Sequence, residues 1–311
     1  MTSSVGSGPL ALVGPTASGK SVLAFEVAAR FGDIEIVSAD SMQVYRGMDI
    51  GTAKPSAEER AAVRHHLLDV AEPCEDWDVA CFQAAATDAL AAIEARGHRA
   101  LFVGGTGLYF HALVDRYCIP GRWPELRRQL EKEPDTALLY RRLQEADPPA
   151  AERIGALNRR RLVRALEVTL GSGRPFSSYG PGVGVFPPTN WRIAGVWLPR
   201  HVVAERVARR FDAMLALGLV EEVRTLMASP GGLSRTARQA LGYKELLAHI
   251  ELGMPLSDAA DEAVRRTRQF ARRQRVWWRR DPRVRWFGAA ENPLELLPAL
   301  LGNWGSGRDG Q

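Results

Sequence analysis

Leu10-Ala-Leu-Val-Gly14-Pro-Thr-Ala-Ser-Gly19-Lys20-Ser21 is the stretch that decides the fold of this 311-residue chain. Its short apolar run predicts a buried strand, which leads into the pattern G-x-x-x-x-G-K-S, and an amphipathic segment follows. A strand, a glycine loop and a helix in this order are the context that a phosphate-binding loop (P-loop, residues 14–21) requires. The alternative is a glycine-rich turn that carries a lysine by chance, and the flanking strand and helix argue against it.

The P-loop pattern also predicts how phosphate groups would be held. Glycine lets the backbone wrap closely around an anion, so that N–H groups point inward. The following helix adds positive partial charge at its N-terminus, and Lys20 adds a full charge. The Ser21 hydroxyl is placed to ligate Mg2+, the cofactor that we expect. The pattern is specific for a diphosphate or triphosphate and does not show what is attached to it.

The length and composition are those of a globular protein with a large core. The chain is 46% hydrophobic and 25% charged, and it could form one large domain or two. No apolar run is long enough to span a bilayer, and we expect no signal peptide in residues 1–9. Because Cys74, Cys81 and Cys118 lack the spacing of metal ligands, a reducing, cytoplasmic location fits best.

The distribution of charge points to an anionic partner. The net charge is +5, and arginines gather in residues 159–164 and again in residues 265–285. Clusters of this kind are typical of proteins that bind a large polyanion such as nucleic acid. A GC-rich genome would also enrich arginine, so the charge alone leaves both explanations open.

Asp40 is the first candidate for a role in catalysis. Residues 35–38 predict a short strand, and Asp40 and Ser41 come just after its carboxyl end. In parallel α/β sheets, ligands bind beyond the carboxyl ends of the strands, so we expect Asp40 to share a crevice with the P-loop. A carboxylate that only caps a turn is the less favoured alternative.

A second glycine loop is predicted to face the same crevice. Residues 79–96 predict a helix, and residues 100–103 predict a strand that runs into Gly104-Gly-Thr-Gly107. Because this loop also follows a strand's carboxyl end, the two glycine loops are expected to hold one ligand from both sides.

The middle of the chain differs from the first third. Residues 124–170 show helical periodicity without a strand signal, and a loop rich in glycine and proline follows at residues 171–189. Residues 193–198 predict a strand that returns to the sheet. We therefore expect an α/β fold, with a P-loop NTPase-like parallel sheet core and a helical insertion domain. The expected parts are the first part of the core (residues 1–119), the insertion (120–189), and the return to the core with C-terminal helices (190–311).

The C-terminal part predicts a series of helices. Residues 201–217 place Arg206 and Arg210 one turn apart on one face, and residues 236–251 predict a further helix. Residues 257–280 predict the last helix, and the tail after Asn303 is expected to lack structure. One face of the last helix carries five arginines, which we expect to meet phosphate unless the face is only solvated: Arg265, Arg268, Arg272, Arg275 and Arg279.

The motifs of the chain resemble those of the tRNA dimethylallyltransferase family. The matching blocks are Gly14-Pro-Thr-Ala-Ser-Gly-Lys-Ser21, Asp40-Ser-Met-Gln-Val-Tyr-Arg-Gly-Met-Asp-Ile-Gly-Thr-Ala-Lys-Pro55, His65-His-Leu-Leu-Asp69, Val103-Gly-Gly-Thr-Gly-Leu-Tyr109, Arg161-Leu-Val-Arg-Ala-Leu-Glu167, Gln239-Ala-Leu-Gly-Tyr-Lys-Glu245 and Ala271-Arg-Arg-Gln274. The resemblance spans nearly the whole chain. The departures are two conservative replacements. Arg272 stands where the family usually has lysine, and Leu241 stands where isoleucine is common.

The resemblance implies transfer of a dimethylallyl group from dimethylallyl diphosphate to N6 of adenine 37, beside the anticodon of tRNA, giving i6A and free diphosphate. It implies Asp40 as the base, Arg210 as the group that stabilises the leaving charge, and Thr16 near the bridging part of the diphosphate. The residues expected to bind the diphosphate are Gly14, Pro15, Thr16, Ala17, Ser18, Gly19, Lys20 and Ser21.

The same resemblance implies how tRNA is bound by this protein, which we expect to be a monomer. The adenine must be splayed out of the anticodon loop to reach the crevice. The residues expected to contact tRNA are Asp40, Ser41, Met42, Gln43, Thr106, Arg127, Arg160, Arg161 and Arg164. Three alternatives remain: a P-loop small-molecule kinase, an adenylate isopentenyltransferase, and an RNA-binding ATPase or chaperone. An assay of prenyl diphosphate consumption distinguishes them: consumption only in the presence of tRNA would favour the tRNA-modifying enzyme over these alternatives.

Overall fold

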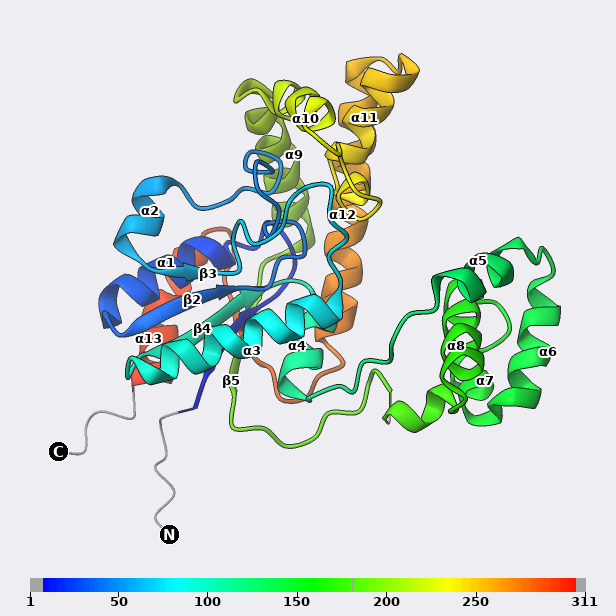
Figure 1. Cartoon of the computed structure of the whole chain (residues 1–311). Coiled ribbons are helices and arrows are strands. Elements are labelled where there is room, and N and C mark those ends of the chain that lie inside the picture. The colour runs from blue at the N-terminus through cyan, green and yellow to red at the C-terminus, as the bar shows by residue number, and fades with distance from the viewer. Residues whose placement is uncertain (1–7, 181, 306–311) are drawn as a thin grey trace, which may run out of the picture. The chain divides into compact units, whose positions relative to one another are not determined.

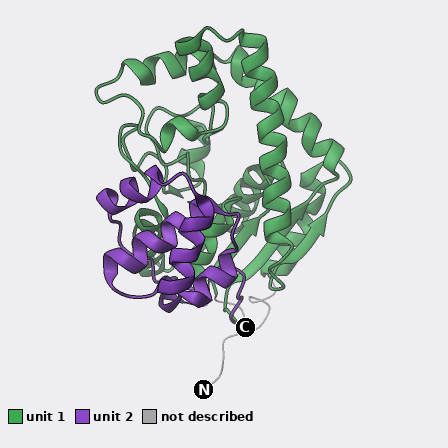
Figure 2. Cartoon of the chain, turned by 90° about the vertical axis from the view of Figure 1, so that its right-hand side faces the viewer, with its two compact units in different colours: residues 1–114, 188–311 green, residues 115–187 purple. Residues whose placement is uncertain are grey.

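The computed structural model describes residues 8–180 and 182–305 of the chain (Figure 1). The chain forms two compact units (Figure 2). One contains residues 1–114 and 188–311, and the other contains residues 115–187. Each unit has its own hydrophobic core, so each is described by itself below.

The first unit is built on a six-stranded parallel sheet with the strand order β3-β2-β4-β1-β5-β6. The strands are β1 (Leu10–Val13), β2 (Ile34–Ser38), β3 (His65–His66), β4 (Arg99–Gly104), β5 (Arg192–Trp197) and β6 (Arg285–Gly288). All four residues of β1 are fully buried, which explains their unbroken apolar sequence. The α/β class with a parallel sheet is therefore confirmed, and β6 is an edge strand that the sequence pattern did not reveal.

Helices cover both faces of this sheet (Figure 1). Leu10 and Leu12 face a core with α1 (Lys20–Phe31) and α13 (Leu297–Gly305), whereas Ala11 and Val13 face a core with α3 (Val79–Ala95) and α4 (Gly107–Val114). Alternate side chains of one strand point to opposite faces, so β1 joins the two cores. The helices of the first unit are α1 (Lys20–Phe31), α2 (Ala57–Ala62), α3 (Val79–Ala95), α4 (Gly107–Val114), α9 (Arg200–Ala216), α10 (Leu219–Ala228), α11 (Tyr243–Leu252), α12 (Leu256–Trp278) and α13 (Leu297–Gly305), with short 3-10 turns η2 (Ala237–Gln239) and η3 (Pro293–Leu296).

The second unit is helical, as the periodicity of residues 124–170 predicted. It contains α5 (Pro124–Lys132), α6 (Thr136–Ala146), α7 (Pro148–Ile154) and α8 (Arg159–Ser172), followed by the 3-10 turn η1 (Phe176–Tyr179). Asp135 and Asp147 accept backbone hydrogen bonds at the N-termini of α6 and α7, which explains why the long helical stretch is divided there. This unit overlaps the expected insertion, and its binding of tRNA stays a prediction.

Two expectations for the C-terminal part are wrong. Residues 236–251 do not form one helix, because Gly242 adopts a φ of +88° and separates η2 from α11. The part of the tail up to Gly305 is helical, and Trp304 is only 1% exposed because it packs in the core with α1. The remaining tail, residues 306–311, lies outside the described residues.

Glu35 of β2 forms a buried charge cluster that should make stability depend on pH. Its carboxylate accepts hydrogen bonds from Arg96 at 2.7 and 2.8 Å and contacts ring nitrogens of His66 and His98 at 2.6 and 2.8 Å. Arg96 above all, with help from the two histidines, lowers the pKa of Glu35 to about 2 against the opposing effect of burial.

Glu35 is therefore expected to add about 3 kcal/mol to the free energy of unfolding at neutral pH. Because the pKa of Glu35 is lowered on folding, its contribution to stability is complete above about pH 4.5 and is lost as the pH falls toward 2. Urea unfolding of Glu35→Gln should show this loss at pH 7 and a smaller difference from wild type at pH 3. Glu58→Gln, an exposed carboxylate on α2, is the control. A pH-independent difference for Glu35→Gln would contradict the linkage.

Candidate active site

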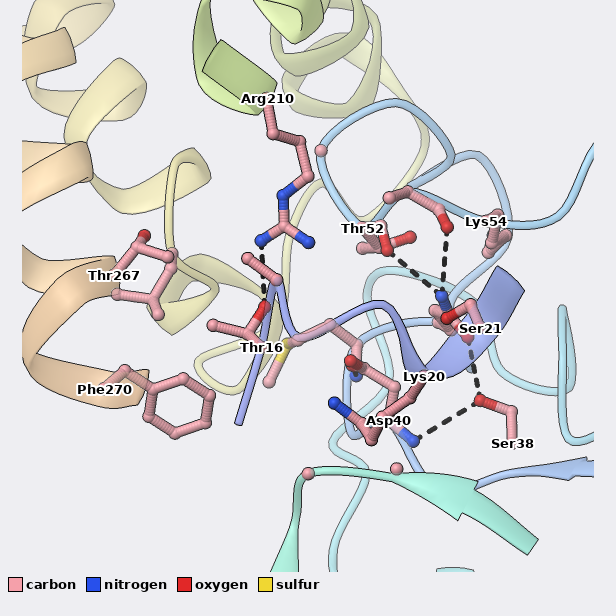
Figure 3. A pocket seen from close by; sticks show the side chains of 18 of the residues that line it. Thr16, Lys20, Ser21, Ser38, Asp40, Thr52, Lys54, Arg210, Thr267 and Phe270 are labelled. Atoms are coloured by element: carbon pink, nitrogen blue, oxygen red, sulfur yellow. Dashed lines mark hydrogen bonds between the residues drawn. The ribbon is translucent and has the colours of Figure 1, made fainter. Parts of the chain in front are cut away.

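A pocket of about 990 Å3 lies in the first unit where the carboxyl ends of three neighbouring strands meet. Figure 3 shows side chains that line it, among them Thr16, Lys20 and Asp40. Thr16, Asp40 and Thr106 follow β1, β2 and β4, and all three line the pocket. The expectations that Asp40 shares a crevice with the P-loop, and that the two glycine loops face one crevice, are therefore confirmed. Helices α9 and α12 supply the opposite wall, including Arg210 and Gln274.

The P-loop backbone is closely packed, as its glycines predicted. Gly14 and Gly19 have φ values of +146° and +86°. A Cβ added at Gly14 would lie 2.9 Å from the Val196 carbonyl oxygen, and one at Gly19 would lie 2.3 Å from Pro293. Both positions therefore require glycine. Ser18 is fully buried, and its hydroxyl has no hydrogen-bond partner among the described residues. Of the residues expected to bind the diphosphate, Gly14, Pro15 and Ser18 do not line the pocket, whereas Thr16, Ala17, Gly19, Lys20 and Ser21 do.

Lys20 lies beneath the P-loop in an environment that disfavours its charge. Its side chain is buried, and Nζ donates a hydrogen bond of 2.6 Å to the Pro15 carbonyl. Burial and the neighbouring charge of Arg210 lower the pKa of Lys20 to about 7, although Asp40 acts in the opposite direction. Lys20 therefore changes its charge near neutral pH, where an arriving phosphate group would favour the protonated form.

Binding of inorganic pyrophosphate is expected to take up protons near neutral pH. A bound anion would raise the pKa of Lys20 above its value of about 7 in the free protein, so the contribution of Lys20 to affinity is fully present below pH 7 and is lost as the pH rises through the raised pKa. Calorimetric titrations at pH 7.5 in buffers of different ionisation enthalpy measure the uptake. Lys20→Met should abolish this proton uptake. Equal proton uptake by Lys20→Met and the wild type would contradict the assignment.

Arg210 and Arg206 hold the P-loop from α9, as Figure 3 shows for Arg210. Arg210 donates to the Thr16 hydroxyl oxygen at 2.9 Å, and Arg206 donates to the Ala17 carbonyl at 2.9 Å. Burial lowers the pKa of Arg210, an effect that the charge of Asp40 opposes. The structure thus brings Arg210, Thr16 and Asp40 into one pocket, although 194 residues of sequence separate Arg210 from Thr16.

Asp40 is held by one carboxylate oxygen. Its Oδ1 accepts a hydrogen bond of 2.9 Å from the Met42 N–H, while Oδ2 accepts none from the residues that the structure describes. The Ser38 hydroxyl donates to Gln43 Oε1 at 2.8 Å, and Gln43 Nε2 donates to the carbonyls of residues 52–53. The amide of Gln43 therefore braces the strand end that carries Asp40, and its contact with tRNA stays a prediction.

Glu222 of α10, which sequence reasoning missed, supports the site without lining the pocket. Its carboxylate accepts hydrogen bonds from the backbone N–H groups of Asp49, Ile50 and Gly51 at 2.9, 2.7 and 3.2 Å, and from the Tyr243 hydroxyl at 2.5 Å. It thereby fixes the loop that receives Gln43. Glutamate on the surface of a helix gives no pattern in sequence that could have revealed this role.

The expected tRNA-binding residues fall into both units. Ser41, Met42, Gln43 and Thr106 line the pocket beside Asp40. The four arginines, Arg127, Arg160, Arg161 and Arg164, belong to the second unit.

Arg127 and Arg164 are engaged inside the second unit. They pair with the buried carboxylate of Glu167 at 3.4 and 2.9 Å, so these two arginines have a structural role. Arg160 and Arg161 are exposed, and their guanidinium groups form no ion pair within residues 8–180 and 182–305. Contact of all four with tRNA stays a prediction.

The expectation of a one-sided arginine face on α12 is wrong in part. Arg275 is only 6% exposed, donates to the Leu198 carbonyl and stacks on the Trp197 ring at 3.8 Å. Arg265 forms an ion pair with Glu262 at 2.6 Å. Arg272 and Arg279 are exposed as expected. The helix therefore uses some of its arginines for packing, because a guanidinium can stack on an aromatic ring while its N–H groups reach a carbonyl.

The site residues fit a magnesium ion that is shared with a phosphate ligand. No group of three or more histidine, cysteine or acidic side chains in the described part of the chain could hold a metal by itself. Ser21 and Asp40 line the pocket and offer the oxygen ligands that Mg2+ prefers. Magnesium is commonly held by one or two protein oxygens together with phosphate oxygens and water, which suits this pair.

None of the described helices is long and apolar enough to cross a membrane.

A parallel α/β sheet, with a P-loop after its central strand and buried cations behind that loop, defines a phosphate-binding protein of the P-loop class. Within that class, the chain belongs to the IPP transferase family. The profile of the family described as IPP transferase matches residues 43–281, and that described as Isopentenyl transferase matches residues 9–75. The resemblance inferred from the motifs is therefore confirmed.

Individual relatives match over nearly their whole length. The tRNA dimethylallyltransferase of Streptomyces avermitilis is 46% identical over 294 residues, which cover 94% of this chain and 93% of that protein. The tRNA dimethylallyltransferase of Moorella thermoacetica is 43% identical over 305 residues, covering 94% of each. The full-length tRNA isopentenylpyrophosphate transferase of Bacillus halodurans superposes with a TM-score of 0.70 at 34% identity, covering 96% of this chain and 97% of that one.

Proposed function

We propose that this protein transfers a dimethylallyl group from dimethylallyl diphosphate to N6 of adenine 37, beside the anticodon of tRNA. One observation carries the proposal: Lys20 and Arg210 lie in the same pocket as the carboxylate of Asp40. Two cations suit an anionic donor, and a carboxylate suits an acceptor that must lose a proton. The relatives named tRNA dimethylallyltransferase support the assignment.

The donor would lie with its diphosphate in the P-loop. Backbone N–H groups of the P-loop and Lys20 would hold the phosphate oxygens, and Arg210 would stabilise charge near Thr16. As the bond between carbon 1 and the bridging oxygen breaks, the electron pair stays on the diphosphate. Cations that meet this growing charge lower the barrier, because they bind the transition state better than the donor.

The acceptor would be activated by Asp40. The lone pair of the exocyclic N6 amine is delocalised into the adenine ring, so the amine is a weak nucleophile. The amine forms the new bond to carbon 1, and its proton passes to Asp40, whose Oδ2 accepts no hydrogen bond from the described residues. General-base catalysis of this kind contributes about 10²–10⁴-fold.

Mg2+ would be held by the Ser21 hydroxyl, and the Asp40 carboxylate lines the same pocket. When bound, the ion would neutralise part of the diphosphate charge. Ser41, Met42, Gln43 and Thr106 would surround the splayed adenine and its neighbours. We further propose a monomer that works in the cytoplasm, where its three exposed, unpaired cysteines would stay reduced.

The exposed arginines of the second unit are expected to contact tRNA phosphates. Replacing both Arg160 and Arg161 with alanine should weaken all substrate tRNAs alike and flatten the salt dependence of binding, by about one unit of slope for each arginine that meets a phosphate. Binding isotherms over a salt series measure the slope. Arg141→Ala combined with Arg142→Ala, an exposed pair on α6, is the control. An unchanged slope for the first pair would leave the phosphate contacts unsupported.

Mass spectrometry of tRNA nucleosides tests the proposed activity. Purified protein, dimethylallyl diphosphate, Mg2+ and unmodified tRNA should yield i6A in the anticodon loop, and omission of any one should abolish it. Prenylation of free adenine nucleotides without tRNA would select the adenylate isopentenyltransferase instead. Transfer of phosphate from ATP to a small molecule would select a kinase.

A further inference from the structure

Gln274 of α12 contacts both glycine loops of the pocket. Its Oε1 accepts a hydrogen bond of 2.8 Å from the Thr16 N–H of the P-loop. Its amide nitrogen packs against the second glycine loop, because a Cβ added at Gly105 would lie 2.2 Å from Nε2. Trp278, one turn further along α12, donates from Nε1 to the Gly105 carbonyl at 3.2 Å. One helix therefore holds two loops that follow neighbouring strands.

Thr16 is bound at two points. Gln274 holds its backbone N–H, and the Thr16 hydroxyl oxygen accepts the hydrogen bond of Arg210. The backbone position of Thr16 decides where that hydroxyl lies, so it also decides the direction of the Arg210 guanidinium. A side chain that fixes the Thr16 backbone thus acts on Arg210 without touching it.

We propose that Gln274 is a positioning residue for prenyl transfer, which aligns Arg210 with the leaving diphosphate through Thr16. The inference rests on the proposed function. The environment of Gln274 supports a specific role. The side chain is only 7% exposed, and burying an amide is costly unless its polar groups form hydrogen bonds. A residue needed only for packing at this place would be better apolar, like its neighbour Ala271.

Gln274→Met keeps the length of the side chain and removes the acceptor for the Thr16 N–H. We expect kcat to fall about tenfold, the loss of about one hydrogen bond, and the donor KM to change less than threefold. Hydrogen–deuterium exchange of the peptide that contains residues 14–21 should become faster in this variant. Gln144→Met, an exposed glutamine on α6, should change neither quantity.

A double-mutant cycle with Thr16→Ala tests the route through Thr16. Thr16→Ala removes the oxygen that Arg210 contacts. In that background, adding Gln274→Met should lower kcat by less than about twofold. Additive losses would overturn the proposal, as would normal kcat with only a lower midpoint of thermal unfolding. If Gln274→Met does not fold, Gln274→Asn keeps the amide but is one methylene shorter and no longer reaches the Thr16 N–H, so kcat should again fall about tenfold; wild-type kcat in Gln274→Asn would also overturn the proposal.

The outcomes separate this inference from the proposed function. If the wild type transfers no prenyl group to tRNA, the proposed function fails, whereas exchange at residues 14–21 still reports whether Gln274 holds the loop. If the wild type is active and Gln274→Met matches it in kcat and in exchange, only the positioning role fails.

Discussion

Replacing Asp40 with alanine is expected to slow the chemical step by about 10²–10⁴-fold, the range of general-base effects. The physical reason is that Asp40 and Glu59 are the carboxylates among the described residues that line the pocket, and the Glu59 carboxylate already accepts the Ser56 N–H at the start of α2. Affinity for tRNA should fall much less, because the Asp40 carboxylate matters mainly as the proton leaves. Single-turnover transfer, with enzyme in excess over tRNA, measures the step directly.

Asp40→Asn gives the sharper version of this test. The amide can keep the hydrogen bond from the Met42 N–H but cannot take up a proton, so its rate should be nearly as low as that of Asp40→Ala. Asp88→Asn, an exposed carboxylate on α3, serves as the control. If the rate of Asp40→Asn stays within about threefold of wild type, Asp40 is not the base.

Replacing Arg210 with alanine is expected to lower kcat by about 10²–10³-fold, as for other groups that stabilise developing negative charge. Donor affinity should fall less, since charge on the bridging oxygen grows only as the bond breaks. Arg210→Lys should recover only part of the rate, because an ammonium group keeps the charge but lacks the planar geometry that reaches Thr16. Steady-state kinetics with varied donor separates kcat from KM.

Arg224→Ala, an exposed arginine on α10, is the control for this substitution. Normal turnover of Arg210→Ala with only a raised donor KM would mean that Arg210 binds donor and transition state equally. In that case the leaving charge would have to be stabilised by Lys20 and the loop backbone alone.

The parts of the site that depend on local sequence were predictable. The P-loop follows from its glycines, because Gly14 and Gly19 occupy backbone conformations and contacts that exclude a Cβ. Asp40 follows from its place after a strand, because parallel strands bring their carboxyl ends to one edge. Arg210 was inferred from the family resemblance, since spacing in the chain gives no reason to pair it with Thr16.

The sequence by itself determined the α/β class, the phosphate site and the family, since apolar runs, glycine positions and motif blocks are local properties of the chain. Only the tertiary structure decided which side chains meet. Gln274 and Thr16 are 258 residues apart, and Arg275 is buried on Trp197 although its helix face reads as basic and exposed. Periodicity tells which side of a helix is polar, but the partner of each polar group depends on how distant segments pack, because hydrogen bonds and ion pairs require contact in space.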